Sequence, residues 1–463
     1  MAPQDEVAAS DAGNVQLDLV EGDPSAGEHT IASSLHFGLV MLALLVRLPF
    51  HLLRHYVFLR PWSPLVQLLG RPASVEVGVQ AVRLIFGKVY LAPSRPVFAK
   101  REKDDWVELV EVNGTKGTWL APPRTERKDD DLVLYFLHGG AFSFDTRGGC
   151  QPFYKLLAEE LNLNRNIQFS VFCLDYQLAP EKIYPSQLIE TLAGYHYLVN
   201  KLGIAEEKIS LGGDSAGACL AAAFMLHLAR PNPRIVVPQS LGPTPKRPGS
   251  ALLLSPFIDL VSYAASRHDP VKLATDFIDD GVVFLGSLSY IGAAHPKGWH
   301  GGPRWNPFKW WGSLCDAPPK GVIEEGLSVE EAEKEGRGIR MLSSPYVNPN
   351  PNVVKDWTWY TEAFPAPLKT MITWGGMEIF SDDIELLVKA LKEAGVAPVE
   401  LCKPLGSHDF ILFDLIVPGS SKVKTGGEES KSDYGVRKIA DFLANQVKGK
   451  ATEVEVQVTE SAK

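Results

Sequence analysis

From residue 131 onward, short apolar runs alternate with longer stretches whose composition is typical of helices. Several of the runs are almost continuously apolar, as expected of strands that are buried on both faces of a sheet. A regular alternation of strand and helix predicts a parallel sheet with helices on both faces. The predicted strands are residues 132–137, 171–174, 208–211, 251–254, 369–373 and 399–402, and the predicted helices are residues 152–161, 184–202, 216–228, 384–394 and 434–447.

Two more strands are predicted before this alternation, at residues 106–112 and 118–120. Asn113-Gly114 lies between them, and Asn-Gly is a strong local signal for a tight hairpin turn. Because Thr115 follows, the same asparagine also matches an N-glycosylation acceptor, which would be modified only in a secretory lumen. We favour the hairpin turn as the interpretation of this motif.

A long insertion interrupts the alternation. Residues 261–345 separate two predicted strands, and they are too many for a plain connection. They therefore predict a cap inserted between two parts of the core, at residues 105–260 and 346–448. The cap contains four tryptophans, which either line an apolar substrate cavity or form the cap's own core. They are Trp299, Trp305, Trp310 and Trp311.

The first part of the chain changes from acidic to apolar. Residues 1–30 contain no Lys or Arg and several acidic side chains, which predicts disorder, as does the polar tail at 449–463. Residues 31–60 are mostly apolar, and a helix needs roughly 20 apolar residues to cross a bilayer. The apolar stretch reaches this length if the side chain of Arg47 extends to the membrane interface. They predict a membrane anchor, with an interfacial helix or a buried lid helix as alternatives. Residues 61–104 are predicted to form a linker and the N-terminal part of the cap.

Composition narrows the possible partners. The net charge of −9 over 463 residues leaves no basic stripe that could neutralise phosphates, which argues against a nucleic-acid partner. With 45% hydrophobic residues the chain can bury a large core. The five cysteines are scattered and form no C-x-x-C pair, so the sequence predicts neither a metal site nor a redox site.

Candidate chemistry lies at the ends of two predicted strands. Gly213-Asp214-Ser215-Ala216-Gly217 follows one strand and precedes an alanine-rich helix, which is the pattern of a nucleophile elbow. His138-Gly139-Gly140-Ala141 follows another strand and matches an oxyanion loop. Together they predict attack of Ser215 on an acyl carbon, with the amides of Gly139, Gly140 and Ala216 facing the developing negative charge.

A serine nucleophile needs a base and a group that orients the base. In a chain with this elbow the order is serine, acid, histidine, so the base lies late in the sequence. His408 follows the last predicted strand of the sheet, and we predict it to be the base. Glu378 follows the strand at 369–373 and is the predicted orienting acid. The nearby Asp382 and Asp383 are interpreted as capping residues of the helix that follows.

Five motifs in order give the chain a family resemblance. They are HGGAF, DYQLAPE, GGDSAG, LLLSPFIDL and SHDF, spread over residues 105–448. The chain resembles the hormone-sensitive-lipase-like branch of the α/β hydrolases, which includes arylacetamide-deacetylase-like enzymes and fungal sterol deacetylases. That branch usually has Asp-Pro-Leu where this chain has Glu378-Ile379-Phe380. It also usually has a third glycine where this chain has Ala141, a difference that narrows the space beside bulky acyl or alcohol groups.

The resemblance implies an α/β-hydrolase fold and a serine carboxylic-ester hydrolase that requires no metal or organic cofactor. We expect a small apolar ester as substrate, such as an acetylated sterol or secondary metabolite, and attachment to the endoplasmic reticulum membrane. The side of the catalytic domain stays open, because basic residues after the apolar segment favour the cytosol whereas the related deacetylases favour the lumen. The alternatives are a non-catalytic small-molecule receptor on the same fold, and an amidase or acyltransferase with the same triad.

Overall fold

The computed structural model describes residues 15–22, 105–122, 127–294, 324, 327–416 and 431–449. The predicted anchor at 31–60, the predicted linker at 61–104 and the four cap tryptophans lie outside these residues. None of the helices in the described ranges combines the length and apolar character that a membrane crossing requires.

The centre of the described structure is an eight-stranded sheet in the order β1-β2-β4-β3-β5-β6-β7-β8. Strands β3 to β8 run parallel to one another, and β2 is antiparallel to both β1 and β4. The mostly parallel sheet predicted from the apolar runs is therefore confirmed. The bounds are β1 Val107–Val112, β2 Thr115–Leu120, β3 Leu132–Leu137, β4 Phe169–Leu174, β5 Ile209–Asp214, β6 Ser250–Leu254, β7 Thr370–Gly375 and β8 Val399–Lys403.

The turn between β1 and β2 has the conformation that its sequence predicts. Asn113 and Gly114 both have positive φ, at 48° and 81°, and Val112 pairs directly with Thr115. Two successive positive φ values match the twist of antiparallel strands, and Asn and Gly adopt them readily. The amide of the Asn113 side chain also donates to Ala193 O at 3.0 Å, which ties the turn to helix α6 (Ser186–His196).

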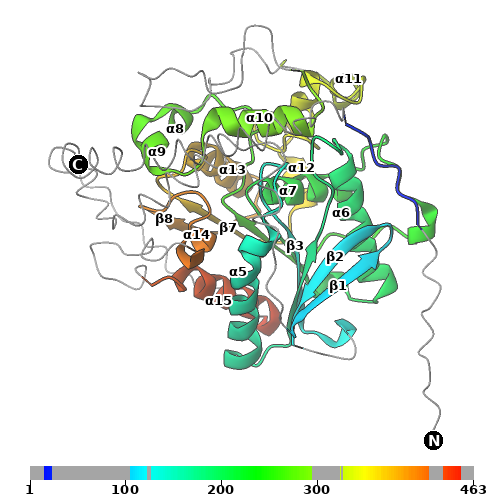
Figure 1. Cartoon of the computed structure of the whole chain (residues 1–463), viewed down its shortest axis with the longest axis vertical. Coiled ribbons are helices and arrows are strands. Elements are labelled where there is room, and N and C mark those ends of the chain that lie inside the picture. The colour runs from blue at the N-terminus through cyan, green and yellow to red at the C-terminus, as the bar shows by residue number, and fades with distance from the viewer. Residues whose placement is uncertain are drawn as a thin grey trace, which may run out of the picture.

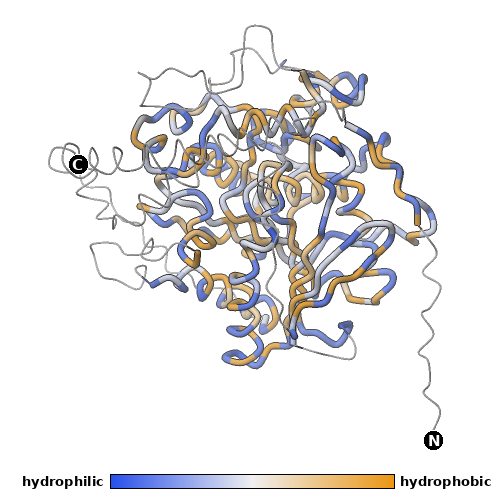
Figure 2. Tube along the Cα trace, viewed as in Figure 1, coloured by the Kyte–Doolittle hydropathy of each residue, from blue (hydrophilic) through white to orange (hydrophobic). Residues whose placement is uncertain are grey.

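The sheet separates two apolar cores. In β3, Val133, Tyr135 and Leu137 belong to one cluster of buried residues, whereas Leu134 and Phe136 belong to the other. Successive side chains of a strand point to opposite faces, so an uninterrupted apolar run indicates burial on both sides. The hydropathy colouring shows this arrangement as apolar strands inside a shell of mixed helices (Figure 2).

Helices cover both faces of the sheet (Figure 1). Helices α5 (Arg147–Glu159), α14 (Phe410–Ile416) and α15 (Tyr434–Lys448) contact one another and pack in one core. Helices α6 (Ser186–His196), α7 (Ala216–Ala229), α12 (Thr358–Ala363) and α13 (Ser381–Glu393) contribute to the other core. Helix α7 is buried on all sides over its first three turns, which explains its almost wholly apolar sequence.

The described part of the predicted cap consists of short helices (Figure 1). They are α8 (Ala265–His268), α9 (Pro270–Thr275), α10 (Asp280–Tyr290), α11 (Val329–Ala332) and the 3-10 turn η8 (Ile339–Ser343). A buried arginine joins this cap to the core. Arg267 on α8 donates to Asp383 of α13 at 2.9 Å and to Asp280 of α10 at 3.0 Å, and its guanidinium lies 4.3 Å from the centroid of the Phe380 ring.

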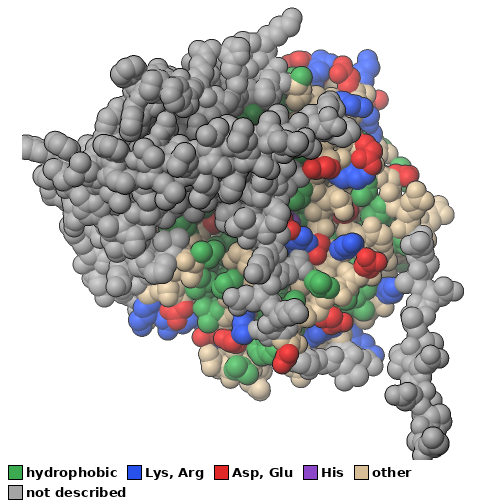
Figure 3. All heavy atoms as spheres, viewed as in Figure 1, with side chains coloured by type: hydrophobic (Ala, Val, Ile, Leu, Met, Phe, Trp, Pro, Cys, Tyr) green, Lys and Arg blue, Asp and Glu red, His purple; other side chains and the backbone are tan. Residues whose placement is uncertain are grey.

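Residues 15–22 form an extended segment that we call the N-terminal strap. Gly22 N donates to Glu181 O at 3.0 Å, and Ile183 N donates to Val20 O at 3.1 Å. Leu17 and Leu19 pack against one of the two apolar cores, the one that contains α6 and α7. The strap lies within residues 1–30, whose composition predicts disorder. The two leucines supply apolar contacts that the average composition of the whole segment does not indicate. On the face shown in Figure 3, basic and acidic side chains are interspersed over the described surface.

Candidate active site

The carboxyl ends of the parallel strands bring the candidate site residues to one edge of the sheet. In open α/β sheets this is the edge at which ligands bind. Strand β3 ends before His138, β5 ends before Ser215 and β6 ends before Ser255. The loops after β7 and β8 carry Glu378 and His408. The sheet order therefore explains how residues far apart in the sequence meet.

Ser215 lies on a sharp turn between β5 and α7. Its φ and ψ are 50° and −116°, a conformation that a non-glycine residue adopts only when its surroundings enforce it. The turn is held because Ser215 N donates to Leu254 O at 2.9 Å and Phe257 N donates to Ser215 O at 3.0 Å. A Cβ at position 217 would lie 1.9 Å from Leu137 O, which explains the glycine after the elbow.

His408 and Glu378 are both fully buried and face each other. Nδ1 of His408 lies 3.8 Å from Oε1 of Glu378. The other oxygen of Glu378, Oε2, accepts hydrogen bonds from the Ser255 hydroxyl at 2.8 Å and from Gly375 N at 2.9 Å. The carboxylate is thus fixed through one oxygen and can orient the imidazole with the other.

The second ring nitrogen of His408 faces a different acid. Nε2 of His408 lies 3.1 Å from Oδ2 of Asp409, and neither ring nitrogen has a hydrogen-bond partner of good geometry among the described residues. Burial alone would lower the pKa of His408, but the negative charges of Asp409 and Glu378 outweigh burial and raise it well above its ordinary value. Phe380 and Phe277 contact the imidazole ring with centroid distances of 4.9 and 5.7 Å, which helps to exclude water from it.

One residue of the inserted cap contacts both the loop that carries Glu378 and the loop that carries His408. Asp276 lies between α9 and α10, and its carboxylate accepts His408 N at 3.1 Å and Ile379 N at 2.8 Å. It is fully buried, and burial raises its pKa while the neighbouring His408 opposes that shift. One side chain from the inserted cap therefore bridges the loop after β7 and the loop after β8.

The backbone amides of the predicted oxyanion loop differ in whether they already have a hydrogen-bond acceptor. Gly139 N donates to Oδ1 of Asp214 at 2.9 Å, so this amide is engaged by the residue before the serine. Within the described residues, the Gly140 and Ala141 amides donate to no other group. The φ values of Gly140 and Ala141 are 108° and 49°, so the loop is held in a left-handed conformation as it passes the serine. Of the three amides predicted to face an oxyanion, that of Gly139 is engaged by Asp214, whereas that of Gly140 has no partner among the described residues and that of Ala216 lies at the start of α7.

The motif at residues 175–181 supports this loop. The Tyr176 hydroxyl donates to His138 O at 2.6 Å, and Ala179 N donates to Phe142 O at 2.9 Å. The ring of His138 stacks on Tyr176 with a centroid distance of 4.3 Å, and burial lowers the pKa of His138 to about 4. His138 is therefore a neutral structural residue. Phe142 stacks on Tyr290 of α10 at 3.8 Å, which connects the loop to the cap.

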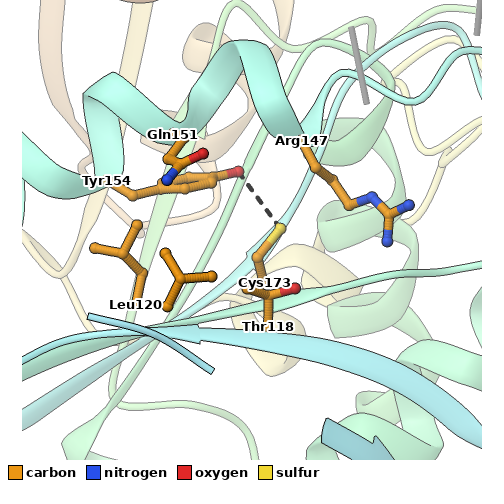
Figure 4. Close-up of a pocket in the computed structure, with 7 residues that line it drawn as sticks. Thr118, Leu120, Arg147, Gln151, Tyr154 and Cys173 are labelled. Carbon is orange, nitrogen blue, oxygen red and sulfur yellow. Dashed lines mark hydrogen bonds between the residues drawn. The ribbon is translucent and has the colours of Figure 1, made fainter. Parts of the chain in front are cut away.

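A small apolar cavity lies between β2, β4 and α5 (Figure 4). The Tyr154 hydroxyl contacts Cys173 Sγ at 3.5 Å inside it, and the Arg147 side chain extends away from it. Arg147 instead pairs with Asp145 and Asp175. The predicted site residues do not line this cavity. In the described ranges, no group of three or more His, Cys, Asp or Glu side chains could hold a metal ion.

Comparison with known proteins agrees with this geometry. Residues 134–320 match a protein family described as the alpha/beta hydrolase fold. This match and the eight-stranded sheet together show an α/β-hydrolase fold. It is 31% identical over 133 residues to human hormone-sensitive lipase, a match that covers 28% of this chain and 12% of the lipase. It is 26% identical over 263 residues to an acetyl-hydrolase of Streptomyces hygroscopicus, covering 56% of this chain and 77% of the relative.

A solved structure is similar over most of the chain. An esterase from the bacterial hormone-sensitive lipase family aligns with a TM-score of 0.53 and 20% identity, covering 81% of this chain and 99% of the esterase. At this identity the likeness shows the fold. The predicted resemblance to the hormone-sensitive-lipase-like branch is confirmed by the curated relatives and these neighbours together. The matched segment of this chain spans only 12% of the length of the human lipase.

Sequence reasoning missed three residues of this site. Ser255 follows a parallel strand directly, and that position alone could have indicated it, because strand ends meet at one edge. Asp409 follows His408 in the sequence, but only its backbone conformation turns its carboxylate toward the ring. Asp276 lies inside a long insertion without a periodic pattern, and no sequence signal distinguishes it from other cap acids.

Proposed function

We propose that the protein is a serine carboxylic-ester hydrolase with Ser215 as nucleophile, His408 as general base and Glu378 as orienting acid. The observation that carries the proposal is the strained conformation of Ser215 at the end of β5, at the same sheet edge as the loops that carry the buried His408–Glu378 pair. A serine on such a turn presents its hydroxyl above the sheet edge. The acetyl-hydrolase and acetyl esterase names of several relatives support the same reaction class.

The reaction follows from these positions. Oγ of Ser215 attacks the acyl carbon while Nε2 of His408 takes the hydroxyl proton, and Glu378 stabilises the resulting imidazolium through Nδ1. The negative charge on the former carbonyl oxygen is received by the amides of Gly140 and Ala216, with Ala141 beside them. His408 then protonates the departing alcohol, and a water molecule activated by the same nitrogen releases the acid from Ser215.

The substrate class is part of the proposal. A small apolar ester with a short acyl group fits an oxyanion loop in which Ala141 replaces a glycine and Phe142 is fixed against Tyr290. Acetylated sterols or secondary metabolites have this chemistry. Attachment to the endoplasmic reticulum membrane through residues 31–60 would bring the site close to such poorly soluble esters.

The test is hydrolysis of a p-nitrophenyl ester series from acetate to laurate by the wild type and by Ser215→Ala. We expect activity highest on acetate, falling with acyl length, and reduced by about 10⁴-fold or more in the variant. Ser210→Ala is the matched control, because Ser210 is a buried serine of the same strand whose hydroxyl has no partner among the described residues. A wild type without activity on any ester would refute the proposal and favour the receptor alternative. Comparison of matched esters and amides would identify an amidase.

A further inference from the structure

The catalytic histidine has an acid on each side of its ring. Glu378 faces Nδ1, and Asp409 faces Nε2, the nitrogen that must accept the proton of Ser215. The Nε2–Oδ2 distance of 3.1 Å is shorter than the Nδ1–Oε1 distance of 3.8 Å. The other oxygen of Asp409, Oδ1, is buried without a hydrogen-bond partner in the described part of the chain, so no other bond explains the position of this carboxylate.

The backbone of Asp409 is fixed in a way that aims its carboxylate. Its φ is 46°, in the left-handed region that Asp and Asn adopt more readily than most residues. Asp409 N donates to the Ser255 hydroxyl oxygen at 3.0 Å, and that hydroxyl donates to Glu378 Oε2 at 2.8 Å. Ser255 thereby connects the backbone of Asp409 to the carboxylate of Glu378 through a single side chain.

The surroundings of the ring are strongly acidic. Besides Glu378 and Asp409, the carboxylate of Asp276 faces the loop from the cap and accepts the amide of His408 itself. Asp214, at the end of β5, is buried and interacts electrostatically with both Asp409 and His408. In the described part of the chain, no Lys or Arg forms an ion pair with any of these four acids. Burial of the ring disfavours a positive charge on the imidazole, and the nearby carboxylates of Asp409 and Glu378 favour it.

We propose that Asp409 is a positioning residue whose carboxylate pairs with Nε2 of His408 in the free enzyme, so that this nitrogen must be released from Asp409 before it accepts the proton of Ser215. The proposal rests on the proposed serine-hydrolase function. It also implies that His408 must release one proton before it can act as a base. Asp409 thus raises the pH above which His408 is neutral and the enzyme is active. Below that pH a smaller fraction of the enzyme has a neutral His408.

The sign of the pH dependence follows from the charges. The carboxylates of Asp409 and Glu378 favour the protonated imidazole, and only the neutral imidazole can accept the proton of Ser215. Activity should therefore rise as pH increases through the pKa of His408. Removing the Asp409 charge should move this acid limb to lower pH, because one of the two groups that stabilise the imidazolium is lost.

The first experiment is the pH profile of kcat/KM with p-nitrophenyl acetate for the wild type, Asp409→Asn and Asp441→Asn. Asparagine keeps the shape and tolerates the left-handed backbone, so we expect the acid limb of Asp409→Asn to fall by about one to three pH units. Asp441 lies on the exposed side of α15 and pairs with Arg165, so its variant removes one surface charge as a control. An unchanged limb in Asp409→Asn would overturn the proposal.

A second measurement does not depend on turnover. Titration of ¹⁵N-labelled histidine by NMR, assigned with His408→Gln, reports the pKa of His408 directly in the wild type and in Asp409→Asn. A lower midpoint in the variant supports the proposal, and an equal midpoint contradicts it. Asp409→Gly is the second variant if Asp409→Asn does not fold, since glycine adopts positive φ freely. Loss of all ester hydrolysis in the wild type would instead refute the hydrolase assignment, so the two failures are distinguishable.

Discussion

At the scale of single residues, the proposed orienting acid, Glu378, is a glutamate where the branch that the chain resembles usually has an aspartate. The side chain is longer by one methylene, and it reaches His408 from the same strand end because Oε2 is anchored by Ser255 and Gly375. Burial raises the pKa of Glu378, while His408 lowers it. The neighbouring imidazole therefore helps to keep this buried carboxylate charged, as its role requires.

The substitution Glu378→Gln tests this role. The carboxamide of the glutamine can keep the bonds from Ser255 and Gly375, but it lacks the charge that stabilises the imidazolium. We expect kcat to fall by roughly 10²–10⁴ with KM little changed, as for loss of a triad acid. Steady-state kinetics on a short acyl ester give both values, and Glu393→Gln at the exposed end of α13 is the control. A decrease in kcat smaller than tenfold would show that another acid orients His408, and Asp276 would be the first candidate.

At the scale of elements, Asp276 connects the cap to the loops that carry Glu378 and His408. Asp276 lies between two cap helices, yet its carboxylate accepts an amide from each of the two catalytic loops. The buried Arg267 adds a second connection from α8 to α13. The cap is therefore a part of the site's architecture, and its displacement would move His408.

Asp276→Ala should weaken both stability and catalysis. Two buried amides lose their acceptor, and each unsatisfied group costs about 1–3 kcal/mol. We expect a lower free energy of unfolding in urea and a lower kcat, with a smaller change in KM. Asp269→Ala is the matched control, because the Asp269 carboxylate caps the start of α9 in the same cap and accepts the amides of Val271 and Lys272. Equal kcat values for the two variants would show that Asp276 contributes to stability alone.

The sequence predicts the central elements well because burial leaves a strong signal. A strand covered on both faces, such as β3, becomes an apolar run, and both β3 and β5 lead into glycine-rich motifs. Helix α14 is missing from the predicted elements, since its seven residues follow the His408 loop directly and are too few to show a period. The orientation of Asp409 depends on one backbone angle, which no spacing of residues encodes.

At the scale of the whole molecule, the N-terminal strap constrains how the protein can meet a membrane. Glu21 pairs with Lys182, and Val20 N donates to the Ser186 hydroxyl at 2.8 Å. These contacts require the strap and the hydrolase fold to lie on the same side of any membrane to which the chain attaches. A segment between them that crossed a bilayer once would place them on opposite sides. Of the alternatives for residues 31–60, an interfacial helix and a buried lid helix both agree with the strap contacts, whereas an anchor that crosses the membrane once does not.

This reasoning predicts that epitope tags at the two ends of the chain share one side of the membrane. In sealed microsomal vesicles we expect an added protease either to remove both tags or to spare both, and detergent should expose any that are spared. The charge reversal Lys182→Glu supplies a control for the strap itself. It should loosen the N-terminal contact, measured as faster hydrogen exchange at Gly22 and Ile183, without altering the side on which either tag lies. Protection of one tag together with digestion of the other would require a single crossing. In that case the strap could not contact the catalytic domain of the same chain in the membrane-bound protein.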